Sequence, residues 1–245
     1  MSHTNPHRGY RVLCARHNTE TQFRVVVEES DLWITAGRDL RFEAAAVLSR
    51  LRGDIKNWIL LFPKFGTSLI PLEAPDSAPE IVRRMCRAAQ AAGVGPFAAV
   101  AGAVAQMLAE ELLPLSPDLI VENGGDTYIC STRSRNVGLL PDPEAGVLLS
   151  DKVSPSDCPV SFCASSGRIG HSLSFGLADL VVARARDAAL ADTFATALAN
   201  MLRSENDIPA VLKRARFFAR HGLDGFFGQC NGKIALWGNM ELAGG

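Results

Sequence analysis

The segment ALADTFATALAN, residues 189–200, decides how the rest of the sequence is interpreted. In a helix, Asp192 and Thr196 lie one turn apart on the same face. The larger apolar side chains recur at three- to four-residue spacing on a different face. These are Leu190, Phe194, Leu198 and Met201. The pattern predicts a helix that packs along one stripe and presents a carboxylate and a hydroxyl on another, facing either a bound ion or water.

The composition is that of a globular protein. The chain has 245 residues, of which 47% are hydrophobic and 21% charged, and its formal net charge is −1. This length is enough for a sizeable core, and we expect one domain over residues 1–245 with residues 1–8 as a flexible arm. A near-neutral chain lacks the basic surface that binding to a phosphate backbone requires, so nucleic acid is not expected as a partner.

The cysteines and the apolar runs indicate the compartment. The six cysteines show no C-x-x-C spacing, so they are read as reduced thiols. The first 18 residues contain no apolar leader segment, and no uncharged apolar run reaches the length of a membrane span. We therefore expect a cytoplasmic protein without membrane association.

Hydrophobic periodicity predicts an α+β fold in which antiparallel strand pairs pack against helix pairs. Alternating β-favouring residues predict strands at 10–17, 21–29, 32–37, 117–123, 127–132, 159–164, 177–185, 225–230 and 233–238. Helical spacing predicts helices at 39–62, 79–92, 97–113, 189–200 and 208–222. The Pro- and Gly-containing region 138–159 is expected to be a long loop. Asn231-Gly232 is a strong hairpin signal for the last two strands.

The stretch VENGGDTYI, residues 121–129, has two interpretations. Asn123, Gly124 and Gly125 tolerate the positive φ of a tight hairpin turn. The same glycines let backbone N–H groups approach an anionic ligand. Asp126 then lies at the turn exit, where it either caps the loop or faces a ligand.

The stretch CASSGRIGHSLSFG, residues 163–176, is either a phosphate-binding loop or a surface connection rich in turn residues. Ser165, Ser166 and Gly167 are the candidate phosphate contacts. His171 titrates near neutral pH and is a candidate acid or base.

Two other residue patterns leave alternatives open. Cys163, with or without Cys158, is a candidate nucleophile for sulfur transfer if a nearby cation or helix N-terminus activates its thiolate. Its alternative is an inert buried thiol. The basic residues of the helix at 208–222 are expected to form a solvated face.

Taken in order, these motifs resemble the ApbE superfamily, whose characterised members are FAD:protein FMN transferases. GPFAAVAGAVAQ (95–106) is similar to a glycine- and alanine-rich segment of that family, LIVENGGDTYI (119–129) to its VNxGGDI hairpin, and FCASSG (162–167) to its ATSG. ALADTFATAL (189–198) is similar to its ALADALATAL. Ala101 stands where the family has a lysine, and only the histidine of the family's HIIDPxTG motif has a counterpart, in His171.

The resemblance implies a T-fold-like α+β domain. It also implies that Asp192 and Thr196 help to hold Mg²⁺ beside the diphosphate of FAD, with a carbonyl from residues 98–101 as a further ligand. We therefore expect an ApbE-like protein that binds FAD or another diphosphate nucleotide with Mg²⁺, with flavin-transfer-type chemistry at His171. The alternatives are a cysteine-based sulfur-transfer protein and a non-catalytic assembly protein on the same fold. Exposed sheet edges make a homo-oligomer an expectation in each case.

Overall fold

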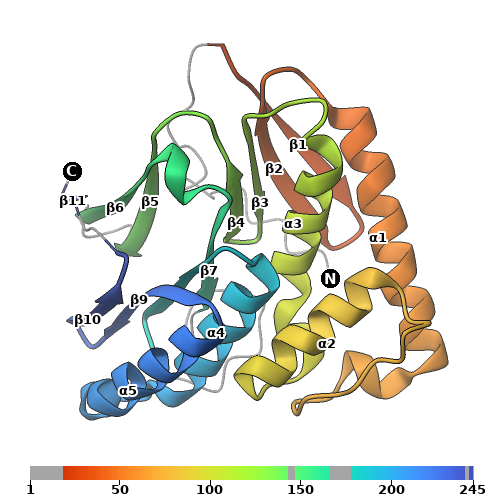
Figure 1. Cartoon of the computed structure of the whole chain (residues 1–245). Coiled ribbons are helices and arrows are strands. Elements are labelled where there is room, and N and C mark those ends of the chain that lie inside the picture. Colours follow the sequence, from red (N-terminus) through yellow and green to blue (C-terminus); the bar gives the residue numbers. More distant parts are fainter. Residues whose placement is uncertain (1–18, 143–146, 166–177, 241–242, 245) are drawn as a thin grey trace.

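One antiparallel sheet of eight strands forms the centre of the molecule (Figure 1). The computed structural model describes residues 19–142, 147–165, 178–240 and 243–244. The strand order across the sheet is β1-β2-β3-β4-β7-β8-β9-β10. The strands are β1 (Thr21–Val27), β2 (Ser30–Ala36), β3 (Leu119–Asn123), β4 (Asp126–Cys130), β7 (Val160–Ser165), β8 (Leu180–Ala185), β9 (Leu223–Cys230) and β10 (Lys233–Gly238). The strand predicted at 10–17 and the arm predicted at 1–8 lie outside the described residues.

Five helices pack on one face of this sheet and bury two apolar clusters against it. They are α1 (Arg41–Leu61), α2 (Glu80–Ala92), α3 (Val100–Leu112), α4 (Ala188–Met201) and α5 (Ile208–Phe218). A 3₁₀ turn (Pro96–Ala99) precedes α3, so the segment predicted as one helix from 97 starts with a tighter turn. The α+β prediction is therefore confirmed.

A second, three-stranded sheet covers part of the opposite face. It has the order β11-β6-β5 and consists of β5 (Arg135–Asp142), β6 (Val147–Val153) and β11 (Ala243–Gly244). A third apolar cluster lies between the two sheets. The prediction of a long loop at 138–159 was wrong, because β5 is an edge strand and an edge tolerates the Pro and Gly that central strands exclude.

Two-residue turns join two of the predicted hairpins. Gly124 and Gly125 have φ of 69° and 115°, and Asn123 pairs with Asp126 across the turn. Asn231 and Gly232 have φ of 51° and 76° between β9 and β10. Positive φ at both central residues is the geometry of the favoured hairpin turn, so both glycine-based predictions are confirmed.

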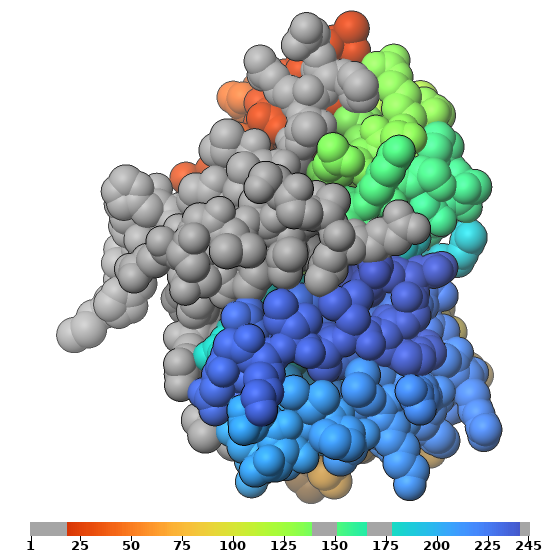
Figure 2. Space-filling view, turned by 90° about the vertical axis from the view of Figure 1, so that its left-hand side faces the viewer, coloured from red at the N-terminus to blue at the C-terminus, as the bar shows by residue number. Residues whose placement is uncertain are grey.

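The helix α4 is buried on almost every side. Phe194 and Leu198 belong to the core as predicted, whereas Leu190 is half-buried and Met201 is 37% exposed. The predicted stripe fails at Met201, which is the last residue of the helix. Figure 2 shows the C-terminal elements at the bottom of the molecule and the first strands at the top, in agreement with the strand order.

Within the described segments, no single helix is both long and apolar enough to cross a membrane. Residues Glu80–Ala92 and Pro96–Leu112 meet the length and composition criterion only as a pair, which is bent by 105°. Both members of this pair contribute side chains to the largest apolar cluster.

Candidate functional site

Two aspartates meet between the sheet and the helices. Asp126 is the first residue of β4, and Asp192 lies in the second turn of α4. Their carboxyl groups lie close enough for their charges to interact, and the thiol of Cys163 on β7 lies close to both. Residues alternate between faces along a strand, so Asp126 and Cys163 both point to the helix side. The sequence placed these three residues in separate motifs, and the fold brings them together.

Backbone N–H groups hold each carboxylate in position. Ala164 N–H donates to Asp126 Oδ1 at 3.1 Å, and Gly102 N–H donates to Asp192 Oδ2 at 2.9 Å. Gly102 lies in the first turn of α3, where N–H groups lack partners within the helix. Asp192 therefore caps α3 from a neighbouring helix, a role that the sequence did not suggest.

Burial raises the pKa of both carboxyl groups. Asp126 is only 6% exposed, and burial is the main cause that raises its pKa to about 7. Burial, followed by the charge of Asp126, raises the pKa of Asp192 well above its usual value. In the described part of the chain, no basic side chain forms an ion pair with either. Two like charges so close do not both ionise without a counter-charge, so the pair shares a proton or binds a cation.

Close backbone packing fixes this geometry. A Cβ at Gly102 would lie 2.2 Å from the carbonyl oxygen of Ala188 and 3.0 Å from Cβ of Asp192. Only glycine allows α3 and α4 to approach this closely. Gly102 is therefore a close-packing position between α3 and α4.

The β3–β4 hairpin lies beside the pair. Asn123 Nδ2 donates to the carbonyl oxygen of Ala101 at 3.1 Å, which ties the hairpin to the start of α3. Gly125 N–H donates to Glu122 Oε1 at 2.8 Å, so this N–H already has a partner. Gly124 and Gly125 form the turn, and their role in admitting a ligand stays a prediction.

Of the remaining predicted site residues, Ser165 and Thr196 lie within the described chain and the others do not. Ser165 is 4% exposed, and its hydroxyl has no hydrogen-bond partner within the described chain. Thr196 lies one turn beyond Asp192 and is half-buried, and no described contact joins it to either aspartate. Ser166, Gly167 and His171 lie outside the described residues, so their predicted roles stay predictions.

The donor set fits a magnesium ion that is shared with a ligand. Asp126 and Asp192 bring two carboxyl groups to one place, and no basic side chain of the described chain forms an ion pair with them. No cluster of three or more His, Cys, Asp or Glu residues suited to a metal occurs in residues 19–142, 147–165, 178–240 and 243–244. Mg²⁺ typically takes one or two protein carboxylates and completes its shell with phosphate oxygens and water. The carboxyl groups of Asp126 and Asp192 are hard oxygen ligands of the kind that Mg²⁺ prefers.

The thiol environment does not favour sulfur transfer. Cys163 Sγ donates to the carbonyl oxygen of Ala188 at 3.5 Å. Burial, with the charges of Asp126 and Asp192, raises the pKa of Cys163 well above its usual value. Burial also raises the pKa of Cys158. Thiols that stay protonated at neutral pH are poor nucleophiles.

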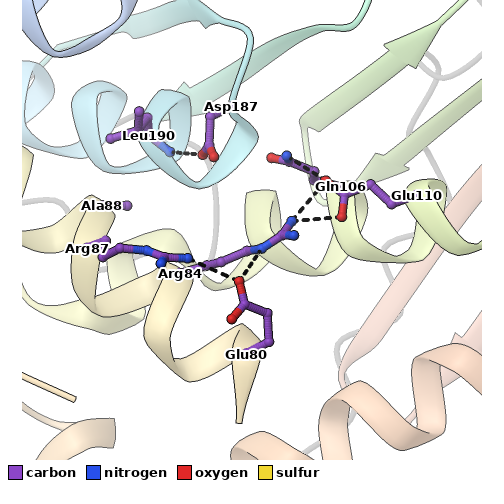
Figure 3. A pocket seen from close by; sticks show the side chains of 8 residues that line it. All are labelled: Glu80, Arg84, Arg87, Ala88, Gln106, Glu110, Asp187 and Leu190. Atoms are coloured by element: carbon purple, nitrogen blue, oxygen red, sulfur yellow. Dashed lines mark hydrogen bonds and ion pairs between the residues drawn. The ribbon is translucent and has the colours of Figure 1, made fainter. Parts of the chain in front are cut away.

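A polar pocket of about 410 Å³ lies where α2, α3 and the start of α4 meet (Figure 3). Arg84 lies between Glu80, at 3.0 Å, and Glu110, at 2.8 Å. Gln106 donates to Glu110 at 2.9 Å and accepts the N–H of Ala188 at 2.7 Å. These polar groups form hydrogen bonds and ion pairs with one another. We therefore interpret them as a structural link between the three helices. Gln106 carries a signal that sequence reasoning missed, since it is a lone amide in an apolar helical run.

Comparison of the fold with solved structures shows the class of protein. A variant of the flavin transferase ApbE from Vibrio cholerae matches with a TM-score of 0.58 at 10% identity, over 89% of this chain and 96% of that one. The ApbE protein from Thermotoga maritima matches with a TM-score of 0.57 at 12% identity, over 88% and 96%. At such low identity the likeness establishes the ApbE fold alone.

Sequence comparison then establishes the family. The chain belongs to the AbpE bacteria family, whose model matches residues 14–219. It is 38% identical over 210 residues to a UPF0280 protein of Archaeoglobus fulgidus, covering 84% of this chain and 87% of the relative. A UPF0280 protein of Methanopyrus kandleri is 39% identical over 198 residues, covering 80% of each chain. The predicted ApbE-like identity is thus confirmed.

Proposed function

We propose that this ApbE-like protein binds FAD or another diphosphate nucleotide together with Mg²⁺ at the Asp126–Asp192 pair. One observation carries the proposal: a buried carboxyl group and a half-buried one, from different elements, lie close enough to interact, and each accepts a hydrogen bond from a backbone N–H. The fold shared with flavin transferases supports a flavin nucleotide as the first ligand to test.

The chain's own groups would act as follows. Ala164 N–H would hold Asp126 Oδ1 and Gly102 N–H would hold Asp192 Oδ2, so that both carboxylates are oriented before a ligand binds. A bound Mg²⁺ would screen the negative diphosphate from the two carboxylates. Thr196 and the hydroxyl of Ser165 are candidate further contacts, because Ser165 is buried without a partner in the described chain.

The test is ligand-dependent stability. FAD and ADP are titrated separately, each with Mg²⁺ or with EDTA, while thermal unfolding is followed. A ligand that binds only the folded state at 100 times its Kd stabilises it by about 2.7 kcal/mol. We expect stabilisation by FAD with Mg²⁺ and its loss in EDTA.

Matched variants locate the site. Asp192→Asn keeps an oxygen that accepts the Gly102 N–H but removes a charge from the pair, so we expect at least ten-fold weaker FAD binding. Asp76→Asn, on an exposed loop residue, is the control and should bind like the unaltered chain. Stabilisation that is equal in EDTA, or equal in Asp192→Asn, would contradict the proposal.

Flavin transfer is the finer hypothesis for this site. It requires an acid or base at the diphosphate, for which His171 is the candidate. Incubation with FAD, Mg²⁺ and an acceptor protein, with release of AMP as the readout, tests it. His171→Ala should abolish release while leaving FAD binding intact, and unchanged release would exclude this histidine.

A further inference from the structure

A second cavity lies at the far end of α4 from the carboxylate pair. It has a volume of about 400 Å³, which is within the usual range for small-molecule sites. Its walls come from the end of α2 and the turn after it, from the last turn of α4, and from α5. The lining side chains other than Arg214 are uncharged.

Arg214 on α5 is the charged residue of this cavity. Its guanidinium lies 4.5 Å from the ring centre of Phe218 and 5.0 Å from that of Phe217. Stacking on aromatic rings holds a guanidinium in place without neutralising it. Among the described residues, no acidic side chain pairs with Arg214, although most arginines around α2 are paired with glutamates.

The turn after α2 lies next to this guanidinium. Gly93 ends α2 in the left-handed conformation, with φ of 79°, and a Cβ built there would lie 3.8 Å from Arg214 Nη2. The half-buried Asn200 of α4 also lines this cavity. Ala92, Val94 and Ala197 supply an apolar wall beside these polar groups.

We infer that this cavity is a binding site for a small organic oxyanion, a phosphate monoester or a carboxylate, whose charged group pairs with Arg214. A guanidinium presents forked donors that match two oxygens of either group. The apolar wall suits the carbon portion of the ligand. A cation would be repelled, and a neutral ligand would leave the guanidinium desolvated without a partner. This site is separate from the Asp126–Asp192 pair and does not depend on its function.

The test uses two pairs of probes in EDTA, which removes any contribution from divalent metal. AMP is compared with adenosine, and benzoate with benzyl alcohol, by calorimetric titration of the full chain. We expect the anion of at least one pair to bind and its neutral counterpart to bind at least ten-fold more weakly. The pair that responds distinguishes phosphate from carboxylate ligands.

Substitutions then assign the binding to Arg214. Arg214→Gln should weaken binding of the anion at least ten-fold, and Arg214→Lys, which keeps the charge but not the fork, should weaken it less. Arg216→Gln, on the exposed side of the same helix, is the matched control and should have no effect. Urea unfolding of each variant checks that the fold is retained.

Two outcomes would overturn the inference. One is that neither anion binds the unaltered chain. The other is that a probe binds equally well to Arg214→Gln. Asp192→Asn should leave anion binding in EDTA unchanged, so failure of the nucleotide proposal and failure of this one are distinguishable.

Discussion

Two groups of charged side chains lie near the first turns of α4, and they differ in how their charge is balanced. At the polar pocket, Arg84 lies between Glu80 and Glu110, so opposite charges meet. At the candidate site, Asp126 and Asp192 meet with no basic partner in the described chain. The first group is complete within the protein. The second needs a proton or a cation from outside, and this need distinguishes a candidate site from a structural link.

The pKa values of the two groups move in opposite directions. Hydrogen bonds from Arg83 and then Arg84 lower the pKa of Glu80 to about 2. Burial raises the pKa of Asp126 to about 7. Matched charge thus favours the ionised form, and burial beside a like charge favours the protonated one.

The largest expected effect on stability comes from a substitution at Gly102, where α3 and α4 touch. Gly102→Val places a branched side chain where the backbones of α3 and α4 touch, so we expect a loss of about 3 kcal/mol of unfolding free energy. Urea unfolding measures this. Gly53→Ala is the control, because a Cβ at Gly53 in α1 meets nothing within 4 Å. It should stabilise the chain by about 0.5 to 1 kcal/mol. A Gly102→Val protein with the same unfolding free energy as the unaltered chain would refute the close-packing argument.

The second prediction concerns the Asp126–Asp192 pair alone, which has no basic partner in the described chain. The raised pKa of Asp126 means that the folded state binds more protons than the unfolded one between pH of about 4 and about 7. The unfolding free energy therefore falls as pH rises through this window. Asp126→Asn removes the penalty, so in EDTA it should be more stable than the unaltered chain by about 2 kcal/mol at pH 8, with little difference at pH 4.

Urea unfolding between pH 4 and 8 measures this effect, with Asp76→Asn as the control. A parallel pH dependence of Asp126→Asn and the unaltered chain would show that the aspartates do not share a proton. The same linkage predicts that Mg²⁺ binding strengthens as pH rises, because the cation competes with that proton.

The smallest expected effect on stability concerns Arg84, Glu80 and Glu110, whose opposite charges pair with one another. Arg84→Met removes the guanidinium between Glu80 and Glu110, and because this group is partly exposed the expected loss is about 1 kcal/mol, decreasing in high salt. Arg87→Met removes a more exposed partner of Glu80 and should cost less. Unfolding at low and high salt compares the two. Equal losses of unfolding free energy would mean that the contact of Arg84 with both α2 and α3 does not stabilise the protein more than the contact of Arg87 within α2.

The sequence predicted the fold better than the site. Periodicity located α1, α2, α4 and α5, and the turn chemistry of Gly124-Gly125 and Asn231-Gly232 located two hairpins. It missed β5, since Pro and Gly in an edge strand are indistinguishable from those in a loop, and it missed β6, which contains neither residue but lies within the same Pro- and Gly-containing region. Asp192 was singled out because a carboxylate is unusual in an apolar helix.

Local patterns fixed what each segment of this chain becomes, because the spacing of apolar residues and the φ preferences of turn residues act within a few positions. They also supplied the motifs that resemble the ApbE family. Tertiary structure alone decided that Asp192 faces Asp126 and caps α3 through Gly102, and that Arg214 opens onto a cavity without an acidic partner among the described residues. Those facts depend on contacts between residues far apart in sequence, and the charge and burial that set their chemistry exist only once the helices and the sheet have packed.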